Sequence, residues 1–179
     1  MKALAEVLKP DVRQEGFVVR EINGSVRAMM LGDCYKDIEA ISLVATVPEK
    51  IQQQFEVARD LMLYGWFVYE FYTVAYQQAL VCLEFGLREA CEIVNGGVNP
   101  CEKRKGLACY MKWAEKHGLI PLGKYHEKLR QFLPNLRNSA AHGSDMLLNY
   151  AMAMPGLKLV AGLLNDVFSA EAVASCQAK

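Results

Sequence analysis

Residues 48–95 read PEKIQQQFEVARDLMLYGWFVYEFYTVAYQQALVCLEFGLREACEIVN, and this stretch decides the fold. Its apolar and small residues recur at intervals of three and four, the spacing of one face of an α-helix; they are Ala58, Leu61, Met62, Gly65, Tyr69, Tyr72, Tyr76, Ala79, Leu83, Leu87 and Ala90. The pattern fits one very long helix but favours two helices that meet between Gly65 and Thr73. Nine of the seventeen aromatic residues lie between Phe55 and Phe85, which is typical of a core or a subunit interface.

Turn-forming residues divide the sequence that follows. Asn95-Gly96-Gly97-Val98-Asn99-Pro100 ends the long segment. We then predict a helix over about residues 107–117 with Gly118 as its C-cap, and another over about 122–133. Pro134 can open a new helical turn, and Gly143 can close it. Ser144-Asp145 then caps a last apolar helix, which bends at Pro155-Gly156 and ends near Phe168.

The N-terminal region shows a different pattern. Residues 17–30 read FVVREINGSVRAMM, where apolar and β-branched residues flank Asn23-Gly24. This dipeptide indicates a β-hairpin with a two-residue turn. After the hairpin we predict a first helix from Cys34 to about Ala45, capped by Asp33, and a break at Pro48.

These elements predict an all-α fold, a helical bundle of five or more helices with a small N-terminal β-hairpin. A chain of 179 residues suits a single core. We expect residues 1–50 to form an N-terminal extension whose hairpin packs on the bundle. Residues 51–170 form the bundle itself, and residues 171–179 form a loose C-terminal tail.

The sequence predicts a cytoplasmic protein without membrane contact. The first residues, MKALAEVLKP, are too short and charged for a signal peptide. Residues 61–83 are the best candidate for a membrane span, but Glu70, Gln77 and Gln78 interrupt them, and a central carboxylate is costly in lipid. The six cysteines form no CxxC pair, so we expect reduced thiols. Cys101, Cys109, His117 and His126 do not have the spacing of a zinc finger or ribbon, so we predict no metal and no cofactor.

Charge is balanced overall but unevenly distributed. The chain has 20 basic and 20 acidic residues, which speaks against a broadly basic nucleic-acid coat. From Cys101 to Arg137 there are nine Lys or Arg against three Glu, a local excess of six positive charges. This strip fits either an anionic partner or the solvated faces of helices.

The stretch LRNSAAHG, residues 136–143, places polar groups inside an apolar context. Arg137 and His142 are five residues apart, which separates them by about 140° around a regular helix. They can still face one groove if the helix ends near Gly143, or if a second copy of the chain supplies the matching pair.

Arg137-Asn138-x-x-x-His142 resembles the signature of the HEPN superfamily, helical domains that include many metal-independent RNases of toxin and antiviral systems. Two other stretches agree. ALVCLEFGLREACE (79–92) resembles the family's helix in which a Glu comes three or four residues before an Arg. MKWAEKHGLI (111–120) resembles the end of a helix, followed by a glycine and apolar residues, that commonly precedes the motif. The resemblance covers about residues 55–168 and leaves the first fifty residues unexplained.

The resemblance implies a homodimeric ribonuclease that uses the RNA 2′-hydroxyl as its nucleophile and needs no cofactor. His142 would be the general base or acid, and Arg137 would hold the scissile phosphate. Asn138 would orient Arg137 or donate a hydrogen bond to a phosphate oxygen, in a supporting role. Glu84 would fix Arg137 or His142, or else only pair with Arg88 along its own helix. The RNA-binding residues would be Lys103, Arg104, Lys105, Lys112 and Lys116 in a dimer groove.

Two further interpretations remain open. The chain can be a non-enzymatic HEPN module that binds nucleotide or RNA, or that dimerises, through the same groove. It can also be a helical interaction protein in which LRNSAAHG only stabilises a helix junction. An antitoxin or regulatory protein is a further expected partner of the ribonuclease.

Overall fold

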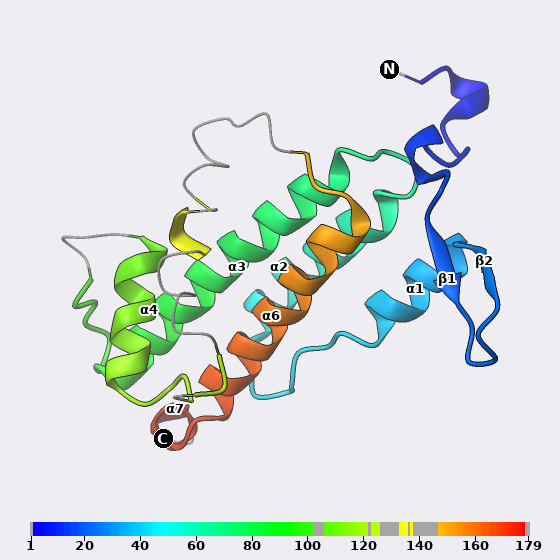
Figure 1. The fold of residues 1–179 in the computed structure, drawn as a ribbon. Helices are drawn as coiled ribbons and strands as arrows, with labels where there is room; N and C mark the ends of the chain where they lie inside the picture. The colour runs from blue at the N-terminus through cyan, green and yellow to red at the C-terminus, as the bar shows by residue number, and fades with distance from the viewer. Residues whose placement is uncertain are drawn as a thin grey trace.

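The computed structural model describes residues 2–101, 106–121, 123–125, 133–135, 137 and 147–177. At its centre lie helices α2 (Glu49–Tyr64) and α3 (Phe71–Val94), which pack against each other (Figure 1). The predicted break at Pro48 and the division into two helices near Gly65 are both confirmed. A Cβ at Gly65 would overlap the Tyr72 ring, so glycine allows α2 to end where α3 returns.

Helix α6 (Tyr150–Ser169) covers α3 along much of its length (Figure 1). The helix was expected to start after Ser144-Asp145, which lie outside the described residues. Its cap is instead Asn149, whose side chain accepts a hydrogen bond from the Met152 N–H at 2.9 Å. Of the described helices, α6 has the length and apolarity of a membrane span, but half of that stretch is buried inside the protein.

Helix α4 (Leu107–Lys116) packs on α3 and ends as predicted at Gly118. Gly118 has a φ of +71°, and the Leu119 N–H donates to the Ala114 carbonyl at 2.9 Å. This is the hydrogen bond of a Schellman cap. The helix predicted over about residues 122–133 lies almost wholly outside the described residues, whereas residues 133–135 and 137 are helical.

The N-terminal hairpin pairs β1 (Val18–Arg20) with β2 (Val26–Ala28), but the predicted two-residue turn is wrong. The Glu21 N–H donates to the Ser25 carbonyl at 2.8 Å, so Ile22, Asn23 and Gly24 form a three-residue loop. The predicted turn type needs positive φ at Asn23 and Gly24, and only Gly24 has it, at +85°.

Helix α1 (Leu31–Glu39) begins earlier and ends earlier than predicted. Asp33 lies inside its first turn and accepts a hydrogen bond from the Met30 N–H at 2.9 Å. The same carboxylate makes two hydrogen bonds of 2.7 Å with Arg27 of β2, which ties the hairpin to α1. The hairpin and α1 lie at the opposite end of the molecule from α4 (Figure 1).

Short helical turns η1 (Leu4–Glu6) and η2 (Val12–Gln14) precede the hairpin. Gln14 is buried and attaches this segment to the bundle, because its amide donates to the Gly65 carbonyl at 2.9 Å and to the Tyr72 hydroxyl at 3.0 Å. At the other end of the chain, in the segment expected to be a loose tail, Glu171–Gln177 forms helix α7 with Val173 fully buried. The described chain is therefore a mostly helical bundle with one small two-stranded sheet.

Candidate functional site: a groove beside Glu84 and Arg137

The site begins with Glu84 on the outer side of α3 and Arg137 opposite it. Leu133 and Pro134 are buried just before Arg137, which anchors its segment against the bundle. Arg137 Nε lies 3.1 Å from Glu84 Oε2, and the two side chains are 36% and 22% exposed. The structure therefore brings together two of the residues singled out from the sequence.

Oε2 of Glu84 is buried and has no hydrogen-bond partner in the part of the chain that the structure describes. The 3.1 Å contact with Arg137 consequently depends on charge rather than on a well-aligned N–H. A partly exposed pair of this kind contributes only about 0–1 kcal/mol to stability. Its effect is to position the guanidinium at the protein surface rather than to hold the fold together.

Arg88, one helical turn after Glu84, does not form the alternative ion pair along α3. Its guanidinium lies 5.0 Å from the centre of the Phe85 ring, a cation–π contact. Among the described contacts Arg88 has no carboxylate partner, and its side chain is exposed. The neighbouring Lys50 is different, because its Nζ is 2.6 Å from Glu89 Oε2. Within the described part of the chain, Arg88 thus adds a positive charge that no carboxylate pairs with, beside Arg137 in the first hollow.

Two adjoining hollows form an open groove at this place. The first has a volume of about 370 Å³ and is lined by Gln54, Val81, Glu84, Phe85, Arg88 and Arg137. The second has a volume of about 650 Å³ and is lined by Glu84, Arg88, Glu89, Glu92, Gly97, Val98, Asn99 and Tyr110. Because Glu84 and Arg88 line both, the hollows adjoin each other, and together they extend from α2 across α3 to the start of α4.

Two of the remaining predicted site residues lie outside this groove, and the other five fall outside the described residues. Lys112 and Lys116 are exposed on α4, but neither lines either hollow. Tyr110 does line the second hollow, and two residues further on a helix rotates the side chain by about 200°, which directs Lys112 away. His142 and Asn138 lie outside the described residues, and so do Lys103, Arg104 and Lys105.

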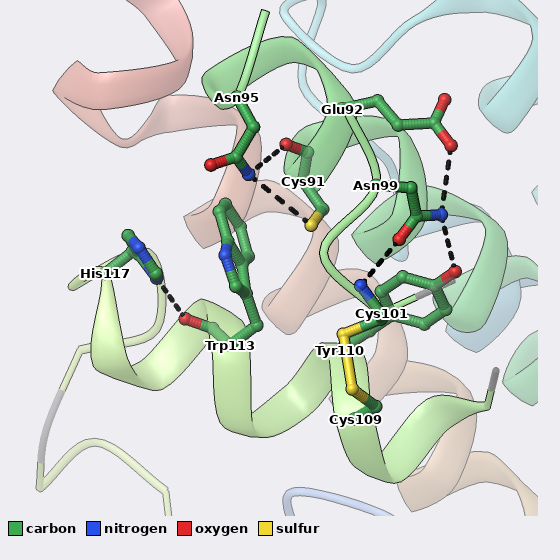
Figure 2. Close-up of a disulfide and its surroundings, with 9 residues drawn as sticks. All are labelled: Cys91, Glu92, Asn95, Asn99, Cys101, Cys109, Tyr110, Trp113 and His117. Atoms are coloured by element: carbon green, nitrogen blue, oxygen red, sulfur yellow. Dashed lines mark hydrogen bonds between the residues drawn. A yellow bond between two sulfur atoms is a disulfide. The ribbon is translucent and has the colours of Figure 1, made fainter. Parts of the chain in front are cut away.

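Sequence reasoning missed the polar wall of the second hollow. Asn99 donates from Nδ2 to the Tyr110 hydroxyl at 2.9 Å and to Glu92 Oε1 at 3.2 Å (Figure 2). Glu92 lies two turns after Glu84, so helical spacing alone could have placed it on the same side of α3. Nothing local pointed to Asn99, which sits in the Asn95–Pro100 segment that the sequence identifies only as a loop.

The expectation of reduced thiols is wrong for two of the six cysteines. Cys101 and Cys109 form a disulfide between this loop and the first turn of α4 (Figure 2). Helix formation brings the pair together, because α4 starts at Leu107 and turns Cys109 back toward the loop. As a disulfide, neither sulfur is a thiolate available to a metal. Among the described residues no group of three His, Cys, Asp or Glu is arranged to hold a metal ion.

Comparisons of the chain with protein-family models, curated proteins and solved structures found no match. The function of the groove is therefore inferred from the chemistry of its own residues.

Proposed function

We propose that the protein is a homodimeric HEPN-type endoribonuclease of the cytoplasm that cleaves RNA without a metal, as the toxin or effector of a defence pair. One observation carries the proposal. Arg137, the arginine of the R-N-x-x-x-H motif, lies in an open groove with a carboxylate behind it and Arg88 beside it. A planar guanidinium at an open surface is suited to a phosphate diester.

The reaction that fits these groups is an internal transfer at phosphorus. The RNA 2′-oxygen attacks the adjacent phosphorus while the bond to the 5′-oxygen breaks, which leaves a cyclic phosphate and a 5′-hydroxyl. His142 takes the 2′-hydroxyl proton or protonates the leaving oxygen, since an imidazole titrates near neutral pH. Arg137 stabilises the negative charge that develops on the phosphate.

Glu84 acts on this reaction through Arg137. Its carboxylate orients the guanidinium before RNA binds, and the incoming phosphate then competes for the same positive charge. Arg88 lines both hollows and supplies a second cation beside Arg137, whereas the second hollow also carries the carboxylates of Glu84, Glu89 and Glu92. In this reaction Asn138 orients Arg137 or donates a hydrogen bond to a phosphate oxygen.

A dimer is part of the proposal because α2 and α3 carry exposed apolar residues, one of which, Val81, lines the groove. Val74 and Val81 lie on one side of α3 and are 41% and 46% exposed, and Val57 and Tyr64 on α2 are similarly exposed. Val81 also lines the first hollow. A two-fold axis through this face would bring two grooves together. Val81→Glu should then convert a dimer to a monomer in light scattering, whereas an unchanged mass would exclude this face.

The deciding experiment incubates the purified protein with single-stranded and structured RNA in EDTA. Arg137→Ala and His142→Ala are compared with two matched controls, Arg20→Ala on the exposed hairpin and His117→Ala at the end of α4. We expect wild type and controls to cleave and the two motif variants to lose at least about 100-fold in rate. Cleavage that persists in both motif variants would contradict the mechanism.

The ion pair itself favours a second candidate, a non-enzymatic module that binds RNA or nucleotide in the same groove. Glu84 neutralises Arg137, which weakens its ability to stabilise a transition state. In this case wild type binds RNA in a salt-dependent manner without cutting it, and Arg137→Ala weakens binding. If the variants bind and cleave RNA as wild type does and differ from it only in a lower melting temperature, the groove is a structural junction.

A further inference from the structure

The Cys101–Cys109 disulfide lies directly behind the wall of the second hollow. Cys101 is 3% exposed at the end of the loop after α3, and Cys109 is partly exposed on the first turn of α4. The neighbours of the two cysteines, Asn99 and Tyr110, line the hollow. The disulfide therefore joins the two chain segments that form one side of the groove (Figure 2).

Hydrogen bonds connect the disulfide to the groove surface. Asn99 Oδ1 accepts from the Cys101 N–H at 2.9 Å, while its Nδ2 donates to the Tyr110 hydroxyl and to Glu92. Asn99 thus holds Cys101, α4 and α3 at once. These hydrogen bonds are only partly buried, so water can compete for them once the covalent link between loop and helix is lost.

The other described cysteines are poor competitors in thiol exchange, with one exception. Burial raises the pKa of Cys34 and of Cys82 to about 12, and it raises the pKa of Cys91 to about 11. The thiolate is the reactive form, so these three groups are inert near neutral pH. Cys176 is the exposed free cysteine of the described chain, and it serves below as the comparison thiol.

We propose that reversible reduction of the Cys101–Cys109 disulfide regulates the groove, with the oxidised protein holding the Asn99–Tyr110 wall in place and the reduced protein releasing it. The two sulfur atoms are the groups that react with the reductant, and the start of α4 is the part of the structure whose conformation changes. The consequence for RNA affinity rests on the proposed function, whereas the change in the wall does not.

The chemistry requires a dithiol reductant. Its thiolate attacks the Cys109 sulfur, which is the more exposed of the two, and breaks the bond to Cys101. The released Cys101 thiolate takes up a proton. The second thiol of the reductant then attacks the mixed disulfide, releases Cys109 as a thiol and leaves the reductant as a disulfide. Two electrons and two protons pass to the protein, and glutathione disulfide reverses the change.

The test measures thiols and amide exchange in the full-length protein without RNA. Maleimide should label Cys176 in the native oxidised protein. After treatment with dithiothreitol, maleimide should label Cys109 as well. Hydrogen exchange of the amides from Leu107 to Met111 should rise by about tenfold or more on reduction and return on reoxidation. The Cys176→Ser variant should respond like wild type, and Cys101→Ser/Cys109→Ser should show fast exchange under both conditions.

Two results would overturn the proposal. One is maleimide labelling of Cys109 before any reductant is added, because then no disulfide exists in solution. The other is unchanged exchange at the start of α4 although labelling proves that the disulfide has been reduced. RNA binding is measured on the same samples, and we expect a weaker affinity after reduction. If neither form binds RNA, the proposed function fails while the exchange data still decide on the switch.

Discussion

Replacement of Gly156 by alanine should destabilise the protein, although alanine favours helices. Gly156 lies inside α6, where the Tyr76 ring of α3 rests against its backbone. A Cβ at this position would overlap the ring edge of Tyr76 and lie 3.1 Å from its Cζ. Tyr76 is buried, so its ring cannot simply move into solvent. The substitution therefore tests the contact that sets how α6 crosses α3, the helix that presents Glu84.

The magnitude follows from two opposing effects. Alanine gains about 0.8–1.0 kcal/mol over glycine in a helix interior. Overpacking a core costs about 1–3 kcal/mol, and overlap with a confined ring belongs at the upper end. The net loss in the free energy of unfolding is then about 2 kcal/mol. For a chain of this size, that loss lowers Tm by about 4–8 °C.

Thermal and urea denaturation of Gly156→Ala should be compared with Gly32→Ala in α1. Gly32 has no atom within 4 Å of an added Cβ, so its substitution should be neutral or stabilise by up to about 1 kcal/mol. Adding Tyr76→Leu to Gly156→Ala should relieve the overlap, giving a coupling of about 1 kcal/mol or more in a double-mutant cycle. If Gly156→Ala raises Tm as Gly32→Ala does, the described packing of α3 on α6 is wrong.

Three further changes test other contacts. The hydrogen bond from Arg13 lowers the pKa of Asp11 from 3.8 to about 2, so Asp11→Asn should cost about 2 kcal/mol at pH 7. Because the folded pKa is depressed, this difference should shrink as the pH falls from about 4 to 2 in chemical denaturation, and a constant difference would contradict it. Glu84→Gln should lower kcat of RNA cleavage about tenfold through misplacement of Arg137, while RNA Kd stays the same or falls because the phosphate no longer competes with a carboxylate; a rise in Kd that matches the loss in kcat would show only a structural role. Cys101→Ser should lower the free energy of unfolding by about 2.5 kcal/mol, the chain entropy of so short a ring, and a reductant should then leave Tm unchanged.

Helix ends were the most predictable part of this protein. Pro48, Gly118 and the stop at Asn95 act through their own backbone, because proline lacks an N–H and glycine accepts positive φ. These effects need no information about the rest of the chain. The division of the long apolar segment near Gly65 was also expected, although its three- and four-residue spacing continues through Gly65 and the break depends on the close approach of the Tyr72 ring.

Elements whose conformation depends on neighbours were less predictable. The Asn23-Gly24 dipeptide indicated the hairpin correctly but not its loop, because the pairing of Glu21 with Ser25 leaves Asn23 at negative φ. The N-cap of α6 is Asn149 and not the predicted Ser144-Asp145, although serine and aspartate are equally good capping residues. Several residues in a sequence can cap a helix, and packing selects among them.

The sequence by itself determined that the chain is mostly helical, where most of its described helices end, and that Arg137 and Glu84 are chemically suited to a shared site. Only the tertiary structure decided that Glu84 pairs with Arg137 rather than with Arg88, and that Cys101 bonds to Cys109. The physical reason is the range of the interactions. Backbone hydrogen bonding and helix periodicity are local, whereas an ion pair or a disulfide depends on where packing places helices that are distant in sequence.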